Sequence, residues 1–505
     1  MLITNSIKWD ILCLIITILV IIIAKHVRML GYWKRRGVLS PKSVYFFGNM
    51  KDIFLGRTTV FGWFKDTYLE FKSQGARYFG IYMFGSPVFV PIDLELTKAI
   101  LKNNFENFYS HGFYYNEKTE PVSVNIFNLD GPRWREIRSK VTPIFTPIKI
   151  KSMYETLTHF ADDLDALLEK RLKSNPVNFK EIMSFYAIDV IGSLAFGQRI
   201  NSMNETKVSE FKINGDKIME PGWNNFKFAI SLMLNHDILR YFGFTQFDNR
   251  ASKFYCNTIT SNVKHREENN IFRNDYLDLL IEAKNSKDES KRLTPQEVIG
   301  QCFIFYIGGF DNFSTALNFL TFEIAKNQKI QDLLREEINS VMNKHNNEIT
   351  YEAMQELHYM NQVIQESFRK YPNFPLLLRK CTKDFKIPGE ELVIEKGTSV
   401  FIPVSGIHYD PEYYQNPDEF VPERFDSKNK RIKSSYQWLP FGEGHRVCIG
   451  MRFAIEEIKI GLTTLLKKYK LRLNEKTKLP LELTRKCLPV KCDEGIWIDL
   501  EKLDN

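Results

Sequence analysis

The stretch that decides the fold is FGEGHRVCIG at residues 441–450, in which three glycines surround a single cysteine, Cys448. Apolar residues at helical spacing begin directly after it and predict a helix over residues 449–469. Glycine lets the backbone take positive φ angles and approach a bulky group closely. The free N–H groups at a helix start favour a thiolate over a thiol, and Arg446 adds positive charge nearby. The stretch therefore predicts an anionic sulfur ligand, and cysteine thiolate is an established ligand of heme iron.

Two interpretations of Cys448 compete. A lone cysteine on a glycine-rich turn is ordinarily a buried structural thiol. Here, however, the spacing Phe-x-x-Gly-x-Arg-x-Cys-x-Gly is complete over residues 441–450, and few patterns of this length are as specific. We therefore expect Cys448 to be the axial ligand of a heme iron, the only metal site predicted. Further residues of the cofactor site are expected to be Phe441, Gly444, Arg446 and Gly450.

The rest of the chain is expected to be mainly α-helical with a minor β region. Residues 294–297 (TPQE) combine a capping-box pair with proline at the first helical position, and open a long helix that could run to residue 325. Gly308 and Gly309 weaken its middle by ~1 kcal/mol each relative to alanine, which suggests that something packs against that point. Other helices are expected over residues 157–171 and 360–371, and strands over residues 392–394 and 399–403.

The N-terminal residues 11–24, ILCLIITILVIIIA, are apolar except for one threonine. A membrane helix needs ~20 residues, and the apolar face extends to residue 30 if Lys25 and Arg28 snorkel. A cleaved signal peptide or a buried strand would be the alternatives, but no small-residue cleavage pattern follows, and the position is terminal. The basic residues 34–36 place the C-terminal side in the cytosol. We expect an uncleaved signal anchor over residues 1–30 and one cytosolic catalytic domain over residues 31–505.

Composition excludes several classes of protein. The 505 residues are 44% hydrophobic, which is enough for a large buried core. The net charge of +8 suits a face that meets anionic lipid or an acidic partner, and no nucleic-acid-binding motif is present. The seven cysteines are odd in number and widely spaced, without a Cys-x-x-Cys pair. We therefore expect no disulfide framework and a folded part on the reducing side of a membrane.

These motifs together resemble the cytochrome P450 family over nearly the whole chain. ESFR at residues 366–369 is similar to the family's Glu-x-x-Arg helix, and PERF at residues 422–425 to the segment that follows it. The resemblance implies a buried cluster of Glu366, Arg369 and Arg424 that holds the cysteine loop, whereas Glu366 and Arg369 alone could be a surface pair. NLDGPRW at residues 128–134 and YWKRRG at residues 32–37 look most like the insect microsomal, xenobiotic-metabolising group.

The resemblance also implies which side chains bind heme b. Trp134 and Arg138 match the family's Trp-x-x-x-Arg helix, whose i,i+4 spacing puts both on one face. In the family both donate to a heme propionate, together with arginines that match Arg446 and Arg379 here. Arg379 taken alone would be read as a surface residue. His111 falls where close relatives commonly carry another propionate-binding arginine, and would be a weaker, pH-sensitive donor.

The long helix departs from the family pattern at Asn312. Family members carry Ala/Gly-Gly-x-Asp/Glu-Thr over the oxygen-binding face of the heme, and residues 308–314 here read GGFDNFS. Asp311 matches the acid of a proton relay, but Asn312 replaces the threonine and its amide does not titrate. Three hypotheses follow. Asn312 holds water while Asp311, Ser314 or the substrate serves the relay; or the chain is an isomerase or dehydratase that works without dioxygen; or it binds heme or a ligand with little turnover.

The implied activity is a monooxygenase that inserts one atom of dioxygen into a small or medium lipophilic substrate, xenobiotic or endogenous. Residues 220–247 are rich in Phe, Leu and Trp and could form a membrane-facing lid. By family position, the pocket is expected to include Phe113, Phe127, Phe303, Ile307, Phe310, Phe374 and Leu376. The alternative for each of these is an ordinary core residue.

The expected partners follow from the missing nucleotide-binding motifs. The sequence carries neither a dinucleotide fingerprint nor a P-loop, so NADPH must act through a separate protein. The resemblance implies NADPH–cytochrome P450 reductase, with cytochrome b5 as a further candidate, at the endoplasmic reticulum membrane. Candidates for a basic docking rim are Arg133, Arg135, Lys140 and Lys433.

Overall fold

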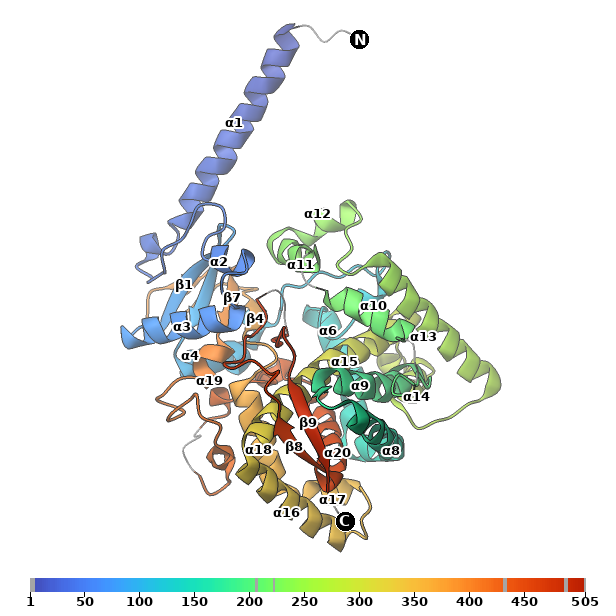
Figure 1. The fold of residues 1–505 in the computed structure, drawn as a ribbon. Coiled ribbons are helices and arrows are strands. Elements are labelled where there is room, and N and C mark those ends of the chain that lie inside the picture. Colours follow the sequence, from blue (N-terminus) through green and yellow to red (C-terminus); the bar gives the residue numbers. More distant parts are fainter. Residues whose placement is uncertain (1–4, 205–207, 221–222, 430–433, 486–488, 504–505) are drawn as a thin grey trace. The chain divides into compact units, whose positions relative to one another are not determined.

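The structure is a computed structural model that describes residues 5–204, 208–220, 223–429, 434–485 and 489–503. It is mainly helical with small sheets, as the sequence predicts (Figure 1). The chain divides into two compact units, Met1–Tyr109 with Leu376–Ile407, and Ser110–Pro375 with His408–Asn505. The cysteine loop and the long helix both belong to the second unit.

The first unit opens with α1, Asn5–Leu30, which ends at the boundary expected for the anchor. Within the described part of the chain, it supplies the one helix long and apolar enough to cross a membrane, over Trp9–Leu30. Its side chains at residues 9–18 are all exposed. Exposed apolar side chains over this stretch are what a membrane-spanning segment requires, so α1 fits the expected anchor.

A four-stranded sheet organises the rest of the first unit. Its order is β1 (Tyr78–Met83), β2 (Ser86–Pro91), β7 (Ser399–Ile402) and β4 (Leu377–Lys380), with β2 and β7 parallel and the other pairs antiparallel. Trp33 is buried against β1 and donates from its indole Nε1 to the carbonyl oxygen of Ile81 at 2.9 Å. A side chain on Gly80 would lie 2.3 Å from the Trp33 ring, so this close approach requires glycine.

The remaining elements of the first unit are short. They are the 3-10 turn Lys34–Arg36, α2 (Lys51–Phe54), α3 (Val60–Ser73), α4 (Leu94–Lys98), a π turn (Ala99–Asn103), α5 (Phe105–Phe108), the paired strands β5 (Phe385–Lys386) and β6 (Val393–Ile394), and α19 (Val404–His408), whose last residue begins the next stretch of the second unit.

Helix α15, Pro295–Lys326, forms the centre of the second unit and is 32 residues long. It starts in the predicted capping box between Thr294 and Glu297. It packs mainly on α9 (Phe179–Phe196) and also contacts α13 (Asn249–Asn269), α14 (Tyr276–Lys284), α18 (His358–Lys370) and α20 (Met451–Lys468). A side chain on Gly300 would lie 1.9 Å from the carbonyl oxygen of Val124, so glycine is needed where the turn η3, Pro121–Ser123, meets the helix.

The other predicted elements are confirmed with small shifts at their ends. The helices expected over residues 157–171, 360–371 and 449–469 are α8 (Tyr154–Arg171), α18 and α20, and the expected strands are β6 and β7. The helix before Pro372 ends at Lys370, because proline disfavours helical backbone at the residue before it. The six described cysteines are free, as expected, and Cys487 lies outside the described residues.

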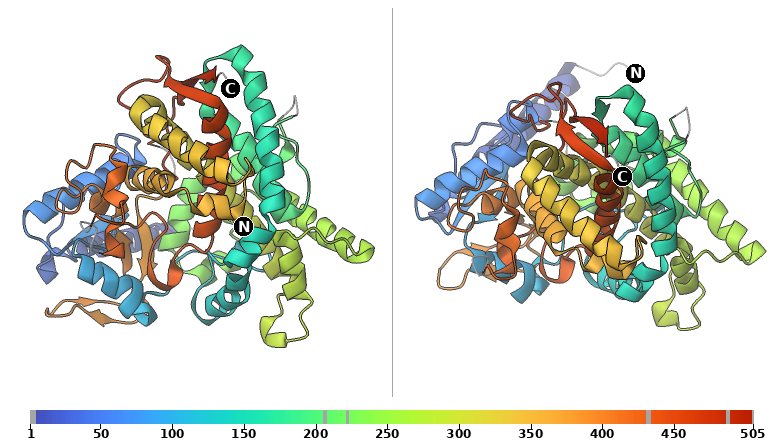
Figure 2. Two further views of the ribbon diagram at one scale, coloured as in Figure 1. Left: turned by 90° about the horizontal axis from the view of Figure 1, so that it is seen from below. Right: turned by 60° about the horizontal axis from the view of Figure 1, so that its bottom comes forward.

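The remaining elements of the second unit surround α15. They are α6 (Gly131–Val141), η4 (Thr142–Phe145), α7 (Pro147–Ser152), η5 (Leu172–Ser174), β3 (Val177–Asn178), α10 (Glu210–Met219), α11 (Trp223–Met233), α12 (His236–Tyr241), η6 (Glu289–Lys291), α16 (Gln328–Lys344), α17 (Tyr351–Gln355), η7 (Pro422–Phe425), η8 (Ser435–Gln437), η9 (Gly444–Arg446), β8 (Tyr469–Leu473) and β9 (Trp497–Lys502). The last two strands pair antiparallel and lie side by side in both views of Figure 2 (red), with β3 on the other edge of β9.

Candidate functional site

Cys448 lies between the turn η9 and helix α20, in a loop that its own backbone closes. The Cys448 N–H donates to the carbonyl oxygen of Phe441 at 2.9 Å. Gly442 and Gly444 have φ angles of 71° and 77°, which favour glycine, as the sequence predicts. Gly450 caps α20 at φ −87°, and a side chain there would come no closer than 3.9 Å to the Phe145 ring. The protein backbone therefore requires glycine at residues 442 and 444 but not at residue 450.

The electrostatics of Cys448 combine two opposing effects. Its residue is exposed, yet enough protein surrounds the sulfur that burial raises the pKa of the thiol. The N–H groups of Gly450 and Met451 and the charge of Arg138 act in the opposite direction and lower this pKa. Burial in turn lowers the pKa of the Arg138 guanidinium, and the Cys448 charge opposes that shift. Burial prevails for the thiol, whose pKa lies above its ordinary value, and Arg138 is the nearby charge that favours the thiolate form.

Helix α15 leaves open space at the point where the sequence predicts a packed group. Gly308 is exposed in the middle of this largely buried helix. A side chain built there would meet nothing within 4 Å, whereas one on Gly309 would lie 2.9 Å from Ile191. An exposed thiol on one element and an open helix backbone on another are compatible with a flat cofactor between them. The residues present therefore fit a thiolate-ligated heme.

The Arg446 side chain contacts Trp134 and the segment that leads into α6. Its guanidinium lies 4.1 Å from the centre of the Trp134 ring. It donates to the carbonyl oxygens of Ile126 and Leu129 at 3.1 and 2.7 Å, and pairs with Asp130 at 3.1 Å. The charge that acts on Cys448 thus comes from Arg138, and the stacked Arg446 orients the buried Trp134.

Asp130 is a site residue to which the sequence assigned no role. Its carboxylate accepts hydrogen bonds from the Ser110 hydroxyl at 2.5 Å and from the His111 backbone N–H at 3.3 Å, besides the Arg446 pair. Burial raises the pKa of Asp130, while Ser110 and Arg446 lower it. The one local signal for Asp130 in the sequence is its place just before the helix that the Trp134 and Arg138 motif implies. The His111 ring itself contacts the carbonyl oxygen of Phe127 through Nδ1 at 3.0 Å.

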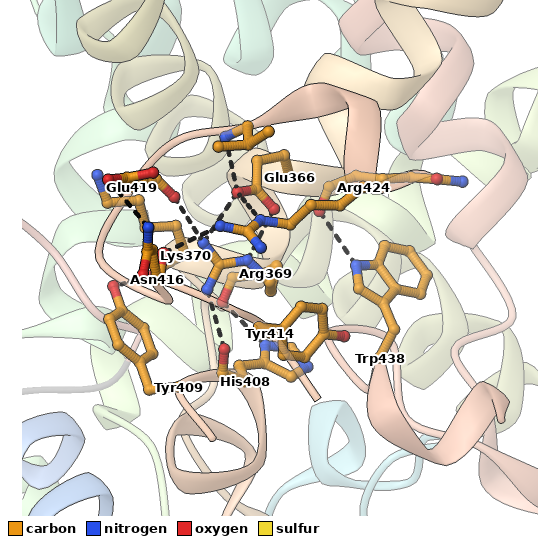
Figure 3. A network of polar contacts seen from close by, with 12 residues as sticks. Glu366, Arg369, Lys370, His408, Tyr409, Tyr414, Asn416, Glu419, Arg424 and Trp438 are labelled. Atoms are coloured by element: carbon orange, nitrogen blue, oxygen red, sulfur yellow. Dashed lines mark hydrogen bonds and ion pairs between the residues drawn. The ribbon is translucent and has the colours of Figure 1, made fainter. Parts of the chain in front are cut away.

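The structure brings Glu366, Arg369 and Arg424 together in a buried cluster (Figure 3). Arg369 donates through Nε and Nη2 to the two carboxylate oxygens of Glu366, at 2.7 and 2.9 Å. Arg424 Nε and the Val421 N–H donate to Glu366 Oε1 at 3.2 and 2.9 Å. Glu366 and Arg369 are completely buried, so each charge depends on the other for compensation.

This cluster is connected to the segment that leads into the cysteine loop. His408 donates through Nδ1 to the carbonyl oxygen of Arg369 and accepts the Leu439 N–H at Nε2, both at 2.9 Å. Burial, then the Arg369 charge, lowers the pKa of His408 to about 3, so its imidazole is neutral and can play both roles. Trp438 Nε1 donates to the carbonyl oxygen of Gln365 at 3.1 Å. His408 was missed from the sequence, because a lone histidine carries no local signal.

Asp311 and Asn312 are both held by neighbouring groups. Asp311 is buried and pairs with Lys491 at 2.6 Å. Asn312 donates from its amide to the carbonyl oxygen of Gly308 at 2.8 Å, and the Asn373 amide donates to the Asn312 carbonyl oxygen at 3.0 Å. The completely buried Ser314 hydroxyl donates to the backbone oxygen of Asp311 at 3.2 Å.

The predicted pocket residues fall into two groups. Phe113 stacks on Phe127 at 4.8 Å, and Phe127 is 42% exposed. By contrast, Phe303 and Phe310 are buried among other rings, with Phe303 at 5.2 Å from Phe247 and Phe310 stacked on Tyr306 at 5.6 Å. The rest of the set comprises buried Ile307, half-buried Phe374 and, in the first unit, half-buried Leu376. Arg379, predicted to bind a heme propionate, is buried in the first unit. The exposed ring of Phe127 is the one best placed to meet a ligand.

Glu120 links the expected lid to the turn η3, which packs on α15. Its buried carboxylate accepts the N–H groups of Gln246 and Phe247 at 3.1 and 2.8 Å. Burial raises the pKa of Glu120 to about 7, against the two N–H groups and the Lys227 charge. On the same segment, Tyr241 and Phe242 are 86% and 78% exposed. Large exposed aromatic side chains suit a surface that meets lipid.

Two of the expected basic-rim residues are engaged within the chain. Arg133 pairs with Glu117 at 3.0 Å, and the buried Lys140 pairs with Glu136 at 2.6 Å. Arg135 is exposed, and Lys433 lies outside the described residues. Among the described candidates, Arg135 is therefore the most accessible to a partner.

Comparison with known proteins places these features in a family. The family model described as Cytochrome P450 matches residues 39–493. The chain is 38% identical to "Probable cytochrome P450 6a18" of Drosophila melanogaster, over 88% of this chain and 89% of the relative. It is 36% identical to "Cytochrome P450 6a8" of the same fly, over 94% and 95% of the two chains. It is 34% identical to "Cytochrome P450 6A1" of Musca domestica, over 94% of each.

Proposed function

The chain belongs to the cytochrome P450 family, and we propose that it inserts one atom of dioxygen into small or medium lipophilic substrates, xenobiotic or endogenous. It is a heme-thiolate monooxygenase, and its electrons come from NADPH. The observation that carries the proposal is the Cys448 loop, with Arg138 acting on the sulfur and an exposed Gly308 in the middle of α15.

Each site residue has a part in this proposal. The heme, when bound, supplies oxygen activation, which its thiolate ligand promotes. Cys448 would ligate the iron, and the closed turn from Phe441 would fix the sulfur. Trp134 and Arg138 would bind a heme propionate, joined by Arg446. Arg446 would also hold the Trp134 ring and Asp130 in place.

The cluster of Glu366, Arg369 and Arg424 would hold the cysteine loop rather than react. Its neutral neighbour His408 supports the backbone at Leu439, directly before the loop. Substrate would meet the exposed Phe127 first, with Phe113 stacked behind it. The proton needed for oxygen activation would be handled beside Asp311 and Asn312 on α15.

An isomerase or dehydratase is the second candidate function, and one observation favours it. The Asn312 side chain cannot titrate, and its N–H is donated to the carbonyl oxygen of Gly308. An enzyme that rearranges an oxygenated substrate needs no proton delivery to dioxygen.

The proposed setting is the endoplasmic reticulum membrane, with α1 as the anchor and the body in the cytosol. Electrons would come through NADPH–cytochrome P450 reductase, with cytochrome b5 as a further partner. The exposed Arg135 is our candidate contact on the docking face. The lipid-facing character of Tyr241 and Phe242 would let substrate enter from the bilayer.

The test is oxygen incorporation in membranes that contain the full chain and the reductase. A panel of alkylbenzenes, whose hydroxylated products retain the inserted oxygen, is supplied with NADPH and isotopically labelled dioxygen, and the products are analysed by mass spectrometry. One labelled oxygen per product is the expected result, and it should vanish in Cys448→Ser. Turnover of a lipid hydroperoxide without NADPH, in the absence of labelled product, would instead establish the isomerase.

A further inference from the structure

Residues 490 and 491 hold α15 at Asp311 and at Asn312, the position where the chain departs from the family pattern. Lys491 Nζ lies 2.6 Å from Asp311 Oδ2, and the two side chains are 16% and 7% exposed. One residue earlier, the Val490 N–H donates to the carbonyl oxygen of Asn373 at 2.9 Å. The side-chain amide of Asn373 then donates to the backbone carbonyl oxygen of Asn312 at 3.0 Å. Two adjacent residues of the helix are thus connected to one short segment.

These contacts replace water around groups that would otherwise be costly to bury. A carboxylate that has lost most of its hydration needs a partner charge, and Lys491 supplies it. The side-chain amide of Asn312 donates to the backbone carbonyl oxygen of Gly308. Asparagine also has no hydroxyl and no ionisable group that could relay a proton. Asp311 is the only ionisable side chain between Ile307 and Asn318. The position of the Asp311 carboxylate therefore decides where this turn of the helix offers an acid for proton transfer.

We propose that Lys491 is a positioning residue for Asp311, and that this ion pair sets how protons reach the oxygen-binding side of α15. With threonine replaced by Asn312, the pair compensates by holding the acid and the nearby backbone in one arrangement. This inference rests on the proposed monooxygenase function for its catalytic consequence, but the ion pair is a property of the fold.

The consequence concerns two competing reactions that use the same reductants. Productive turnover consumes one dioxygen, two electrons and two protons, and yields one hydroxylated product and one water. The unproductive route uses the same dioxygen, two electrons and two protons, and yields hydrogen peroxide. The electrons come from NADPH in both cases, so the ratio of product to NADPH consumed reports how well protons are delivered.

The first experiment measures the ion pair without turnover. Hydrogen exchange of the full chain in lipid nanodiscs is compared for the natural protein, Lys491→Met and Lys491→Arg. Loss of the pair should speed exchange of the Val490 amide about tenfold, because its hydrogen bond to Asn373 loses local support. Lys491→Arg should restore slow exchange, since arginine can also pair with a carboxylate. The control is Lys478→Met, which removes an exposed lysine whose partner is Glu494.

The second experiment measures coupling with an alkoxycoumarin, NADPH and reductase. Lys491→Met should lower the product formed per NADPH and raise hydrogen peroxide severalfold, and Lys491→Arg should reverse both changes. In an Asp311→Asn background, Lys491→Met should have no further effect, because its target is gone. Equal exchange and equal coupling in Lys491→Met and Lys478→Met would overturn the inference and leave the proposed function intact. If the natural protein formed no oxygenated product, the proposed function would fail. The inference about Lys491 would be judged separately, since unchanged Val490 exchange in Lys491→Met would show that the ion pair does not hold this segment.

Discussion

Replacing Glu366 by glutamine tests how much the buried cluster contributes to the fold. The side chain keeps its size but loses its charge and one acceptor oxygen. In the natural protein Oε1 accepts from Arg369, Arg424 and the Val421 backbone, and Oε2 accepts from Arg369 Nε. Whichever way the new amide turns, its NH2 group faces at least one of these donors. The completely buried Arg369 is also left without a compensating charge.

The expected cost follows from this burial. Breaking a completely buried ion pair by removing one partner costs about 3–5 kcal/mol. At roughly 2 °C for each kcal/mol in a large domain, the apparent melting temperature should fall by about 6–10 °C. The cluster supports the segment before Cys448 through His408, so heme content per protein should fall as well.

The assay is differential scanning fluorimetry and heme quantification on the purified full chain. The matched control is Glu352→Gln, which breaks an exposed pair with Lys151. Exposed pairs contribute about 0–1 kcal/mol, so this control should stay close to the natural protein. If Glu366→Gln melted and bound heme like Glu352→Gln, the reasoning from buried charge would be refuted.

Three further predictions follow from other parts of the second unit. Glu120 titrates near its usual value of 4.5 in the unfolded chain and near 7 in the fold, so the folded state binds more protons between these values. The free energy of unfolding should therefore fall by up to about 3 kcal/mol as pH rises through that window. Glu120→Gln should melt at a higher temperature than the natural protein at pH ~8, and at the same temperature at pH ~5. Equal melting temperatures of the two proteins at both pH values would contradict this. His408→Phe should lower the free energy of unfolding by about 2–4 kcal/mol, because the buried Leu439 N–H loses its acceptor, and hydrogen exchange at that amide would check it. Gly300→Ala should lower the free energy of unfolding by about 1–3 kcal/mol, because the new side chain clashes with the backbone carbonyl of Val124. Gly308→Ala should change the free energy of unfolding by less than ~1 kcal/mol. Similar losses in the two variants, measured by chemical denaturation, would argue against open space beside Gly308.

The parts of the fold that the sequence predicts are those governed by contacts close along the chain. The capping box that starts α15 acts over three residues, and its hydrogen bonds form as expected. Glu366 and Arg369 are one helical turn apart, so their pairing could be expected as well. The end of α18 before Pro372 depends on the neighbouring residue alone. Each of these signals is complete within a short window of sequence.

The parts that the sequence could not predict join residues far apart in the chain. The Asp311–Lys491 pair has no local pattern, because nothing near Lys491 marks it as the partner of a helix 180 residues earlier. Arg446 lies two residues from Cys448 in the chain, yet nothing in that stretch marks Trp134 and Asp130 as its contacts. Its place at a heme propionate stays a prediction. Phe303 and Phe310 read alike in the sequence, and only the fold shows that both join a buried aromatic cluster. Their membership of the substrate pocket stays a prediction.

The central claim is that Cys448 ligates a heme iron as a thiolate, and the carbon monoxide difference spectrum tests it most directly. The purified full chain is reduced with dithionite in the presence of carbon monoxide, alongside Cys448→Ser and the buried-cysteine control Cys302→Ser. The account predicts the red-shifted Soret band of a thiolate-ligated heme in the natural protein and the control, and its loss in Cys448→Ser. A natural protein without that band, or a Cys448→Ser variant that retains it, would contradict the account.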